Sequence, residues 1–252
     1  MNPLLEVEDV SKSFRGIKAL DGLSMKIRQG LVYGIIGPNG SGKTTLLNVI
    51  TSVVKPDTGK VIFQGKRIDN LEPYQIYNMG ITRSFQIPTL FMNMVVFENL
   101  MVPPKNQIGE KVVYSFRRSK WSRQDVQIGD QAAEVLSYLK LFDIALNKCG
   151  EVSGGQMKLV ELGRAMMSEP KLVLLDEPTA GVNPVLALEI FNHIKRLRDN
   201  FGLTFMIVEH RYDMLFNNAD YIFLLNEGKI ASEGTPEKIL QDPVLAQVYI
   251  GD

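Results

Sequence analysis

Two patterns of hydrophobic and polar positions recur along the chain and predict two kinds of strand. Apolar and polar residues alternate in Leu23–Ile27 (LSMKI), as in a half-buried strand, so we expect an antiparallel sheet near the N-terminus. Later runs are almost continuously apolar, which is typical of parallel strands that are buried on both faces. These runs are Leu31–Ile36 (LVYGII), Lys171–Leu175 (KLVLL), Leu203–Val208 (LTFMIV) and Tyr221–Leu225 (YIFLL).

Helical patterns separate several of these buried runs. The clearest one extends from Val185 to Arg198, where apolar residues recur at helical spacing. Buried strands that alternate with helices indicate βαβ units, in which helices cover both faces of a parallel sheet. The predicted fold class is therefore α/β, with a mainly parallel sheet and an N-terminal antiparallel β subdomain.

The buried-strand pattern disappears in the middle of the chain, between about Pro88 and Ala165. This stretch is mainly helical in character, and its section from Pro103 to Gln131 is polar and irregular. We interpret it as a helical subdomain, about 88–165, that is inserted into a core formed by about 1–87 and 166–252. The chain, 1–252, is thus expected to be a single domain with one insertion.

The composition narrows the class of protein. Of the 252 residues, 45% are hydrophobic, as is normal for a globular protein with a sizeable core. The 28 basic and 28 acidic residues balance, so no overall nucleic-acid-binding surface is indicated. The single cysteine, Cys149, excludes an internal disulfide and fits a reducing compartment.

Nothing in the sequence predicts insertion into a membrane. No apolar run approaches the roughly 20 residues that span a bilayer. The N-terminus also lacks the basic start of a signal peptide. We therefore expect a cytoplasmic protein that reaches a membrane only by docking on a partner.

A phosphate-binding loop follows the first buried run. GPNGSGKT (Gly37–Thr44) matches the G-x-x-x-x-G-K-[ST] pattern and lies between a predicted strand and an apolar helix. Its glycines let backbone N–H groups turn inward toward phosphate oxygens, while Lys43 adds positive charge and Thr44 offers a hydroxyl to Mg²⁺. The alternative, a glycine-rich turn with an incidental lysine, does not explain this context. The predicted nucleotide-binding residues here are Gly37, Pro38, Asn39, Gly40, Ser41, Gly42, Lys43, Thr44 and Thr45.

Two acidic residues follow the buried run of KLVLLDEP (Lys171–Pro178). Asp176 ends the predicted strand, and ligands of parallel sheets bind at that end. Its carboxylate can hold Mg²⁺, and the neighbouring Glu177 is a candidate general base for the attacking water. A charged turn without chemistry is the alternative, and the phosphate loop makes it the weaker one.

Three further side chains are candidates for the same site. His210 follows the LTFMIV strand, where it can hydrogen-bond a γ-phosphate or align the water with Glu177, although a lone histidine is often structural. Gln86, in RSFQIP, can reach Mg²⁺ or the water, or it is simply a polar loop residue. Phe14 can stack on a base or pack in the core. His193 is interpreted as an ordinary helix residue.

A second phosphate-binding segment begins at Val152 (VSGGQ). Ser153 is a favourable N-cap, and the glycines after it let a ligand approach the start of a helix. The free N–H groups at such a start attract anions. The segment has no lysine or magnesium carboxylate of its own, so it makes sense as half of a site that something else completes. This half-site consists of Ser153, Gly154, Gly155 and Gln156.

The order GPNGSGKT, FQ, VSGGQ, LVLLDEP and VEH resembles that of the ATP-binding subunits of ABC transporters. The resemblance extends from about Leu4 to Asp252 and implies a RecA-like P-loop core. It also implies an ATPase that uses ATP and Mg²⁺. By resemblance, Phe14 matches the adenine-stacking aromatic residue, Gln86 the Q-loop, and His210 the switch histidine. Ser153–Gln156 matches the signature motif.

The resemblance also implies partners. In this family two ATPase subunits face each other head to tail, and each ATP lies between the phosphate loop of one and the signature of the other. The partners are thus a second ATPase subunit, in a homodimer or heterodimer, transmembrane permease subunits and an extracytoplasmic substrate-binding protein. Nucleic acid is not among them. The expected location is the cytoplasmic face of the cell membrane, as a peripheral protein.

Finer details resemble importers of branched-chain and other hydrophobic amino acids. They include GITRSFQ, AGVNP, VEHR and a terminal YIGD. The ATPase of lipopolysaccharide export shares some of them and is the main alternative. A soluble ABC protein of translation or DNA repair is disfavoured, because the chain has one phosphate loop and no sustained heptads. Asn183 stands where many members have aspartate, and Val152 where leucine is commoner.

Overall fold

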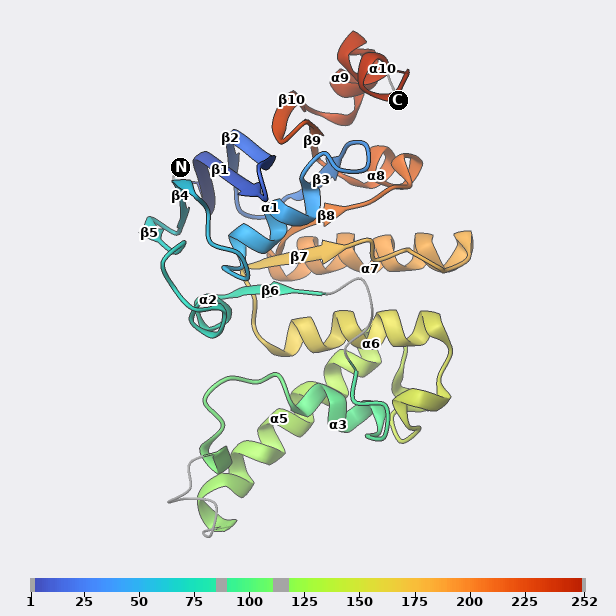
Figure 1. Cartoon of the computed structure of the whole chain (residues 1–252). Coiled ribbons are helices and arrows are strands. Elements are labelled where there is room, and N and C mark those ends of the chain that lie inside the picture. The colour runs from blue at the N-terminus through green and yellow to red at the C-terminus, as the bar shows by residue number, and fades with distance from the viewer. Residues whose placement is uncertain (1–2, 85–89, 111–117, 251–252) are drawn as a thin grey trace. The chain divides into compact units, whose positions relative to one another are not determined.

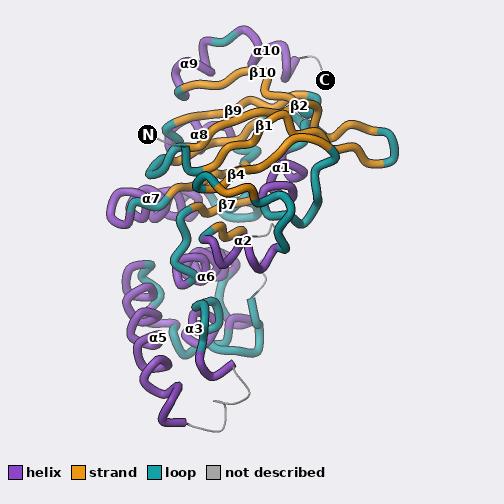
Figure 2. The backbone as a smooth tube through the Cα atoms, turned by 90° about the vertical axis from the view of Figure 1, so that its left-hand side faces the viewer, coloured by secondary structure: helices purple, strands orange, loops and turns teal. Residues whose placement is uncertain are grey.

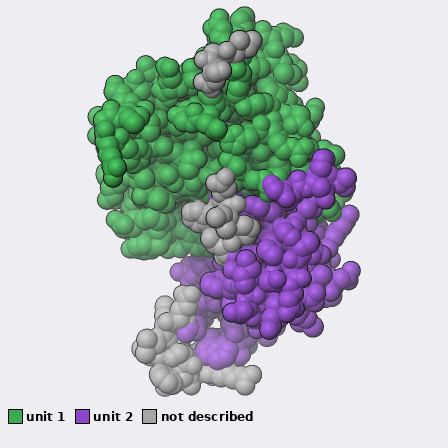
Figure 3. All heavy atoms as spheres, turned by 45° about the vertical axis from the view of Figure 1, so that its right-hand side comes forward, with its two compact units in different colours: residues 1–83, 171–180, 187–252 green, residues 84–170, 181–186 purple. Residues whose placement is uncertain are grey.

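The computed structural model describes residues 3–84, 90–110 and 118–250. The chain divides into two compact units, coloured separately in Figure 3. Unit 1 comprises residues 1–83, 171–180 and 187–252, and unit 2 comprises residues 84–170 and 181–186. Unit 1 contains both β-sheets, whereas unit 2 contains the helices from the middle of the chain (Figure 1).

An antiparallel sheet is formed by the N-terminal strands of unit 1, which Figure 2 shows in orange. Its strand order is β2-β1-β4-β5. Val7 of β1 pairs with Met25 on one side and Val61 on the other, so three apolar side chains lie across one buried face. The strands are β1 (Leu5–Phe14), β2 (Ile17–Ile27), β4 (Thr58–Phe63) and β5 (Lys66–Arg67).

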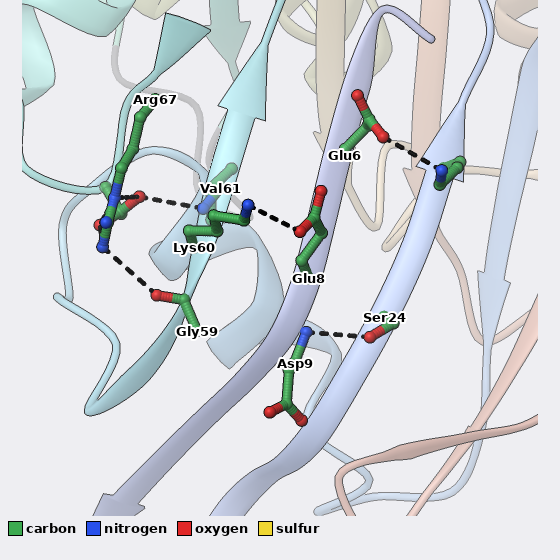
Figure 4. A network of polar contacts seen from close by, with 10 residues as sticks. Glu6, Glu8, Asp9, Ser24, Gly59, Lys60, Val61 and Arg67 are labelled. Atoms are coloured by element: carbon green, nitrogen blue, oxygen red, sulfur yellow. Dashed lines mark hydrogen bonds and ion pairs between the residues drawn. The ribbon is translucent and has the colours of Figure 1, made fainter. Parts of the chain in front are cut away.

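The opposite face of this sheet carries charged pairs, drawn in Figure 4. Glu8 Oε2 lies 2.9 Å from Lys60 Nζ on β4, and Glu6 Oε2 lies 3.2 Å from Lys26 Nζ on β2. The alternation of apolar and charged residues therefore separates a buried face from an exposed one, as the LSMKI pattern predicts.

The second sheet of unit 1 has six strands in the order β10-β9-β3-β8-β7-β6. All neighbouring pairs are parallel except β9 with β10, which form an antiparallel hairpin at one edge. The carboxyl ends of the five parallel strands therefore meet at the same edge of the sheet. The strands are β3 (Val32–Ile36), β6 (Ile81–Arg83), β7 (Leu172–Asp176), β8 (Thr204–Val208), β9 (Tyr221–Asn226) and β10 (Lys229–Gly234).

One hydrophobic core joins the two sheets of unit 1 and its first helix. Leu46 and Leu47 of that helix belong to the same buried cluster as Val7 of the antiparallel sheet and Ile35 and Val208 of the parallel sheet. This packing fixes the phosphate loop, which ends where the helix begins. The helices of unit 1 are α1 (Lys43–Ile50), α2 (Pro73–Met79), α8 (Tyr212–Asn218), α9 (Pro236–Gln241), α10 (Pro243–Ile250) and most of α7 (Pro184–Phe201).

Three helices pack together in unit 2, and Gly163 marks the point where they meet. A Cβ at Gly163 of α6 would lie 3.3 Å from Val135 Cγ1 of α5 and 3.4 Å from Leu100 Cδ2 of α3, so the absence of a side chain lets the three helices approach closely. The described elements are α3 (Val96–Met101), α5 (Arg118–Tyr138) and α6 (Gly154–Met167), with short 3₁₀ turns at Ile108–Glu110, Phe142–Ile144 and Cys149–Glu151.

The fold-class prediction is confirmed, and one local prediction is wrong. The apolar runs form β3, β7, β8 and β9, and the predicted helix lies within α7. The section from Pro103 to Gln131 is not irregular throughout, because α5 begins at Arg118. The start of this helix was not recognised because few of the residues in the section are apolar. Ile128 and Ala132 of α5 are nevertheless buried, and they give the helix one buried face. Among the described residues, no helix combines the length and apolar character needed to cross a membrane.

Candidate functional site

The phosphate loop lies where the sequence places it, between β3 and α1. Gly42 precedes the helix in a left-handed conformation, with a φ of 103°, and Gly37 has a φ of 149°. A Cβ at Gly37 would lie 2.2 Å from the carbonyl oxygen of Leu225, and one at Gly42 would lie 2.4 Å from that of Ala19. These two glycines are therefore required by neighbouring backbone, and they give the loop its tight turn.

Lys43 is buried in this loop, with 7% of its surface exposed. Its ammonium group donates to the carbonyl oxygens of Gly37 at 2.7 Å and Pro38 at 2.8 Å. Burial lowers the pKa of Lys43, and the nearby carboxylates of Glu177 and Asp176 oppose that shift. The lysine thus holds positive charge at the centre of the loop, where phosphate oxygens are expected to bind.

Asp176 is buried at the carboxyl end of β7, and its partner is a residue that sequence reasoning missed. Arg83, at the end of β6, brings its Nη2 to 2.9 Å from Asp176 Oδ2. The other arm of the guanidinium donates to Asn48 Oδ1 at 2.6 Å. Arg83 therefore fixes the orientation of the carboxylate and links it to α1. No sequence pattern marked Arg83, because β6, the strand that it ends, is only three residues long.

Glu177 and His210 meet at the ends of neighbouring strands. Glu177 Oε1 lies 2.8 Å from His210 Nε2, at hydrogen-bonding distance. The side chain of His210 is 43% exposed and that of Glu177 is 19% exposed, so both can be reached by a ligand. The structure therefore brings together a carboxylate and an imidazole that the sequence places more than thirty residues apart.

The backbone of Glu177 is in the left-handed region, with a φ of +51°. Such a conformation is uncommon for a residue with a side chain and is kept only where its surroundings enforce it. Here the Glu177 N–H donates to the carbonyl oxygen of Val208 at 2.8 Å, and the Ala180 N–H donates to that of Glu177 at 3.0 Å. The loop after β7 is thus held on the end of β8.

Phe14 ends β1 and is not a core residue, because 44% of its surface is exposed. Lys12 Nζ lies 5.6 Å from the centre of its ring, and the same ammonium contacts Asp57 at 2.7 Å. The ring is therefore held from one side by a cation and accessible from the solvent, which suits a planar aromatic partner. This exposure excludes the alternative in which Phe14 packs in the core.

The second predicted phosphate segment lies in unit 2 and has the N-cap that its sequence predicts. Ser153 Oγ accepts a hydrogen bond from the Gln156 N–H at 3.3 Å, and Gln156 Oε1 accepts one from the Ser153 N–H at 2.9 Å. This reciprocal pair is a capping box. Ser153 and Gly154 are exposed, so the start of α6 is open to an anion.

Gly155 is closely packed, so a side chain at this position would require its neighbour Leu186 to move. A Cβ there would lie 1.7 Å from Leu186 Cδ2, at the start of α7. The second glycine of VSGGQ therefore serves the packing of α6 on the segment 181–186, whereas Gly154 has open space around it. Of the two glycines, Gly154 is the one placed to meet a ligand.

Asn183, at the position where aspartate is commoner, caps the start of α7. Its Oδ1 accepts a hydrogen bond from the Leu186 N–H at 2.9 Å, as an N-cap of α7 does. An amide oxygen performs this role as well as a carboxylate. The missing charge therefore does not disturb the start of the helix.

Removing this cap is expected to lower stability. The substitution Asn183→Ala should reduce the free energy of unfolding by about 1 kcal/mol, because one N–H at the start of α7 loses its acceptor. The matched variant Asn183→Asp keeps the acceptor and should unfold at the wild-type denaturant concentration or above it. Urea unfolding of the three proteins followed by circular dichroism measures the difference. Equal midpoints for Asn183→Ala and the wild type would show that the hydrogen bond contributes nothing.

Gln86, predicted to contact Mg²⁺ or the water, lies outside the described residues. Most of the other candidates of unit 1 lie together at the carboxyl edge of the parallel sheet: the phosphate loop, Asp176, Glu177 and His210. Phe14 is the exception, since it ends β1 of the antiparallel sheet. No cluster of three or more metal-binding histidine, cysteine or acidic side chains occurs among the described residues.

Comparison with known proteins shows which family and which relatives this chain is similar to. Residues 20–180 match the ABC transporter family. A relative from Methanocaldococcus jannaschii, "Probable branched-chain amino acid transport ATP-binding protein LivG", is 45% identical over 99% of this chain and 98% of its own length. A protein of the same name from Archaeoglobus fulgidus is 40% identical over 98% of this chain and 95% of its own length.

Solved structures show the same fold. The ADP conformation of an ATP-binding cassette from an ABC transporter superimposes with a TM-score of 0.86 at 43% identity, with all of both chains covered. A dimeric ATP-binding cassette bound to ADP and Pi, in a post-hydrolysis state, superimposes with a TM-score of 0.76 at 25% identity. That match covers 92% of this chain and 98% of the other.

Proposed function

Because the chain belongs to the ABC transporter family, we propose that it is the ATP-hydrolysing subunit of an importer for branched-chain or other hydrophobic amino acids. The resemblance noted in the sequence is thereby confirmed at the level of the family, whose ATP-binding subunits are ATPases. The substrate class is supported by the names of relatives that match along nearly the whole chain.

The observation that carries the hydrolytic function is the Glu177–His210 contact beside the phosphate loop. A protein that only binds nucleotide needs neither side chain. In our proposal the Glu177 carboxylate accepts a proton from the attacking water, and His210 holds the water and the γ-phosphate in line. At 2.8 Å the imidazole and the carboxylate contact each other directly, so His210 also orients the Glu177 carboxylate.

The phosphate loop supplies binding and charge neutralisation. Its N–H groups and the Lys43 ammonium are expected to contact the β- and γ-phosphates, and Phe14 to stack on the adenine. Mg²⁺, when bound, neutralises charge on the phosphate oxygens. Asp176 and the exposed residue Thr44 are suited to hold the ion. Arg83 contacts one carboxylate oxygen of Asp176 and thereby fixes the orientation of that carboxylate. Gln86 is proposed as a further contact to the metal or the water.

We also propose that the catalytic sites are shared between two ATPase subunits. Ser153–Gln156 offers an anion site without a cation or metal carboxylate of its own. A nucleotide held by the phosphate loop of one subunit would complete it. A dimeric cassette among the structural relatives supports such an arrangement.

The permease is proposed to dock on unit 2. Phe91 and Met92 are 47% and 43% exposed, although the neighbouring Leu90 and Val96 are buried. The guanidinium of Arg164 lies 5.2 Å from the centre of the Phe91 ring, which fixes the aromatic at the surface. An exposed phenylalanine and methionine suit a short helix of a permease. The subunit would then work at the cytoplasmic face of the membrane, with a substrate-binding protein on the other side.

Uptake by the assembled transporter tests this function. The subunit, its permeases and the binding protein are reconstituted in vesicles, and radiolabelled leucine uptake is followed with ATP on the side of the ATPase. We expect ATP-dependent accumulation that is absent with Lys43→Ala, because the phosphates lose their cation. Loss of lipid from the membrane without leucine uptake would instead favour the export alternative and contradict the proposal.

A further inference from the structure

A buried glutamate, Glu209, contacts both the loop that carries Glu177 and the segment that carries His210. Glu209 directly precedes His210 at the end of β8, and only 3% of its surface is exposed. Its carboxylate does not face solvent, so it is not a surface charge. None of the residues that the structure describes forms an ion pair with Glu209 through a lysine, arginine or histidine side chain. A buried carboxylate without a cation is costly unless it is well hydrogen-bonded.

The hydrogen bonds of Glu209 reach both loops. Its Oε1 accepts from the Thr179 N–H at 2.8 Å and from the Thr179 hydroxyl at 2.6 Å. Its Oε2 accepts from the N–H of His210 at 3.2 Å. Thr179 is itself 1% exposed and follows Glu177 by two residues. One carboxylate therefore binds the loop after β7 with one oxygen and the backbone of His210 with the other.

We propose that Glu209 is a positioning residue for ATP hydrolysis, because its carboxylate ties the loop of Glu177 to the backbone of His210. The two strands already run side by side, with Asp176 paired to Val208. Strand pairing ends at those residues, however, and the two functional side chains lie beyond it. Glu209 extends the connection beyond the strands, to Thr179, three residues after Asp176, and to His210, two residues after Val208.

The backbone of Glu177 explains why such a connection is needed. A residue with a side chain at a φ of +51° relaxes unless the residues after it are fixed. The two hydrogen bonds to Thr179 hold the loop two residues further on. They are charge-assisted, since the acceptor is a carboxylate, and are stronger than bonds between neutral groups. Without them, the distance between Glu177 Oε1 and His210 Nε2 would no longer be set.

The proposal rests on the proposed roles of Glu177 and His210, so its test includes variants of both Glu209 and Glu177. Glu209→Gln keeps the size of the side chain but replaces one acceptor oxygen with an NH₂ donor. That donor would face either the Thr179 donors or the His210 N–H. We expect kcat to fall by about 10- to 100-fold, the loss that a misplacement of about 1 Å causes. The affinity for ATP should remain near the wild-type value, because the phosphate loop is untouched.

Thr179 supplies a second pair of variants, which matters if Glu209→Gln does not fold. Thr179→Val removes the hydroxyl and keeps the shape, and it should also lower kcat. Thr179→Ser restores the hydroxyl and should recover most of the rate that Thr179→Val loses. Equal rates for the valine and serine variants and the wild type would overturn the proposal.

A double substitution separates positioning from general destabilisation. If Glu209 acts through Glu177, adding Glu209→Gln to Glu177→Gln should hardly lower the residual rate further, because the group to be positioned is already inactive. The same loss in both backgrounds would mean that Glu209 acts independently and would overturn the proposal. Wild-type turnover in Glu209→Gln would do so as well. Wild-type turnover in Glu177→Gln would instead overturn the assignment of the base.

Discussion

Replacing Glu177 by glutamine should lower the rate of ATP hydrolysis by roughly 10²–10⁴-fold, the usual contribution of a positioned general base. The amide keeps the size of the side chain and can still contact His210, but it cannot accept a proton from water. Binding of ATP should be retained, because the proposed phosphate contacts come from Gly37–Thr44. Steady-state phosphate release and equilibrium binding of a fluorescent ATP analogue measure the two quantities.

A matched control for this substitution is Glu134→Gln, on the exposed surface of α5. It makes the same chemical change at a residue that is not among the candidates and should hydrolyse ATP at the wild-type rate. If Glu177→Gln retained most of the wild-type turnover, Glu177 would not be the base. If it lost ATP binding, the side chain would belong to the binding site and the fall in rate would say nothing about proton transfer.

Replacing Ser153 by arginine should abolish most turnover by a different route. The serine is exposed at the start of α6, and a long cationic side chain there would fill the proposed half-site and remove the N-cap. We expect hydrolysis to fall by roughly 10²-fold or more, the loss expected when a preorganised donor to a reacting group is removed. The ATP affinity of the isolated subunit should stay nearly unchanged, because the phosphate loop lies in unit 1.

The control for this variant is Ser153→Thr, which keeps a hydroxyl at the N-cap position. It should retain most of the activity and the thermal stability of the wild type. Loss of ATP affinity in isolated Ser153→Arg would contradict the half-site interpretation, since the signature would then bind the nucleotide of its own chain.

The apolar runs could be found in the sequence because parallel strands are buried on both faces. The run LVYGII contains β3, whose five residues are all buried, and the five residues of β7 and of β8 are buried likewise. In contrast, β6 has three residues and β4 is half polar, so neither stands out in the sequence. The helix α5 was partly missed for a related reason. It is mostly polar, and its stability comes from packing in unit 2, which a local pattern does not report.

The candidate site was predictable only where a motif or a strand end marked a residue. The phosphate loop and Asp176 each belong to a motif and lie at the end of a predicted strand. No motif or strand end predicts the contact of Arg83 with Asp176 or that of Glu209 with Thr179, because each contact joins segments that are distant in sequence. These contacts depend on the order β8-β7-β6 and on the register of Asp176 with Val208. Sequence periodicity indicates that strands are buried, but it does not give their order or register.

The most direct test of the account is an equal mixture of Ser153→Arg and Lys43→Ala subunits. In the proposed dimer of a single variant both sites are damaged. Ser153→Arg damages the signature in each site, and Lys43→Ala damages the phosphate loop in each site. A mixed dimer has one site with both defects and one site with neither. We predict that the mixture hydrolyses ATP faster than either variant alone, with turnover that rises as mixed dimers form. A mixture no more active than its components, from variants that both fold and dimerise, would contradict the claim that the chain completes its catalytic site with a second subunit.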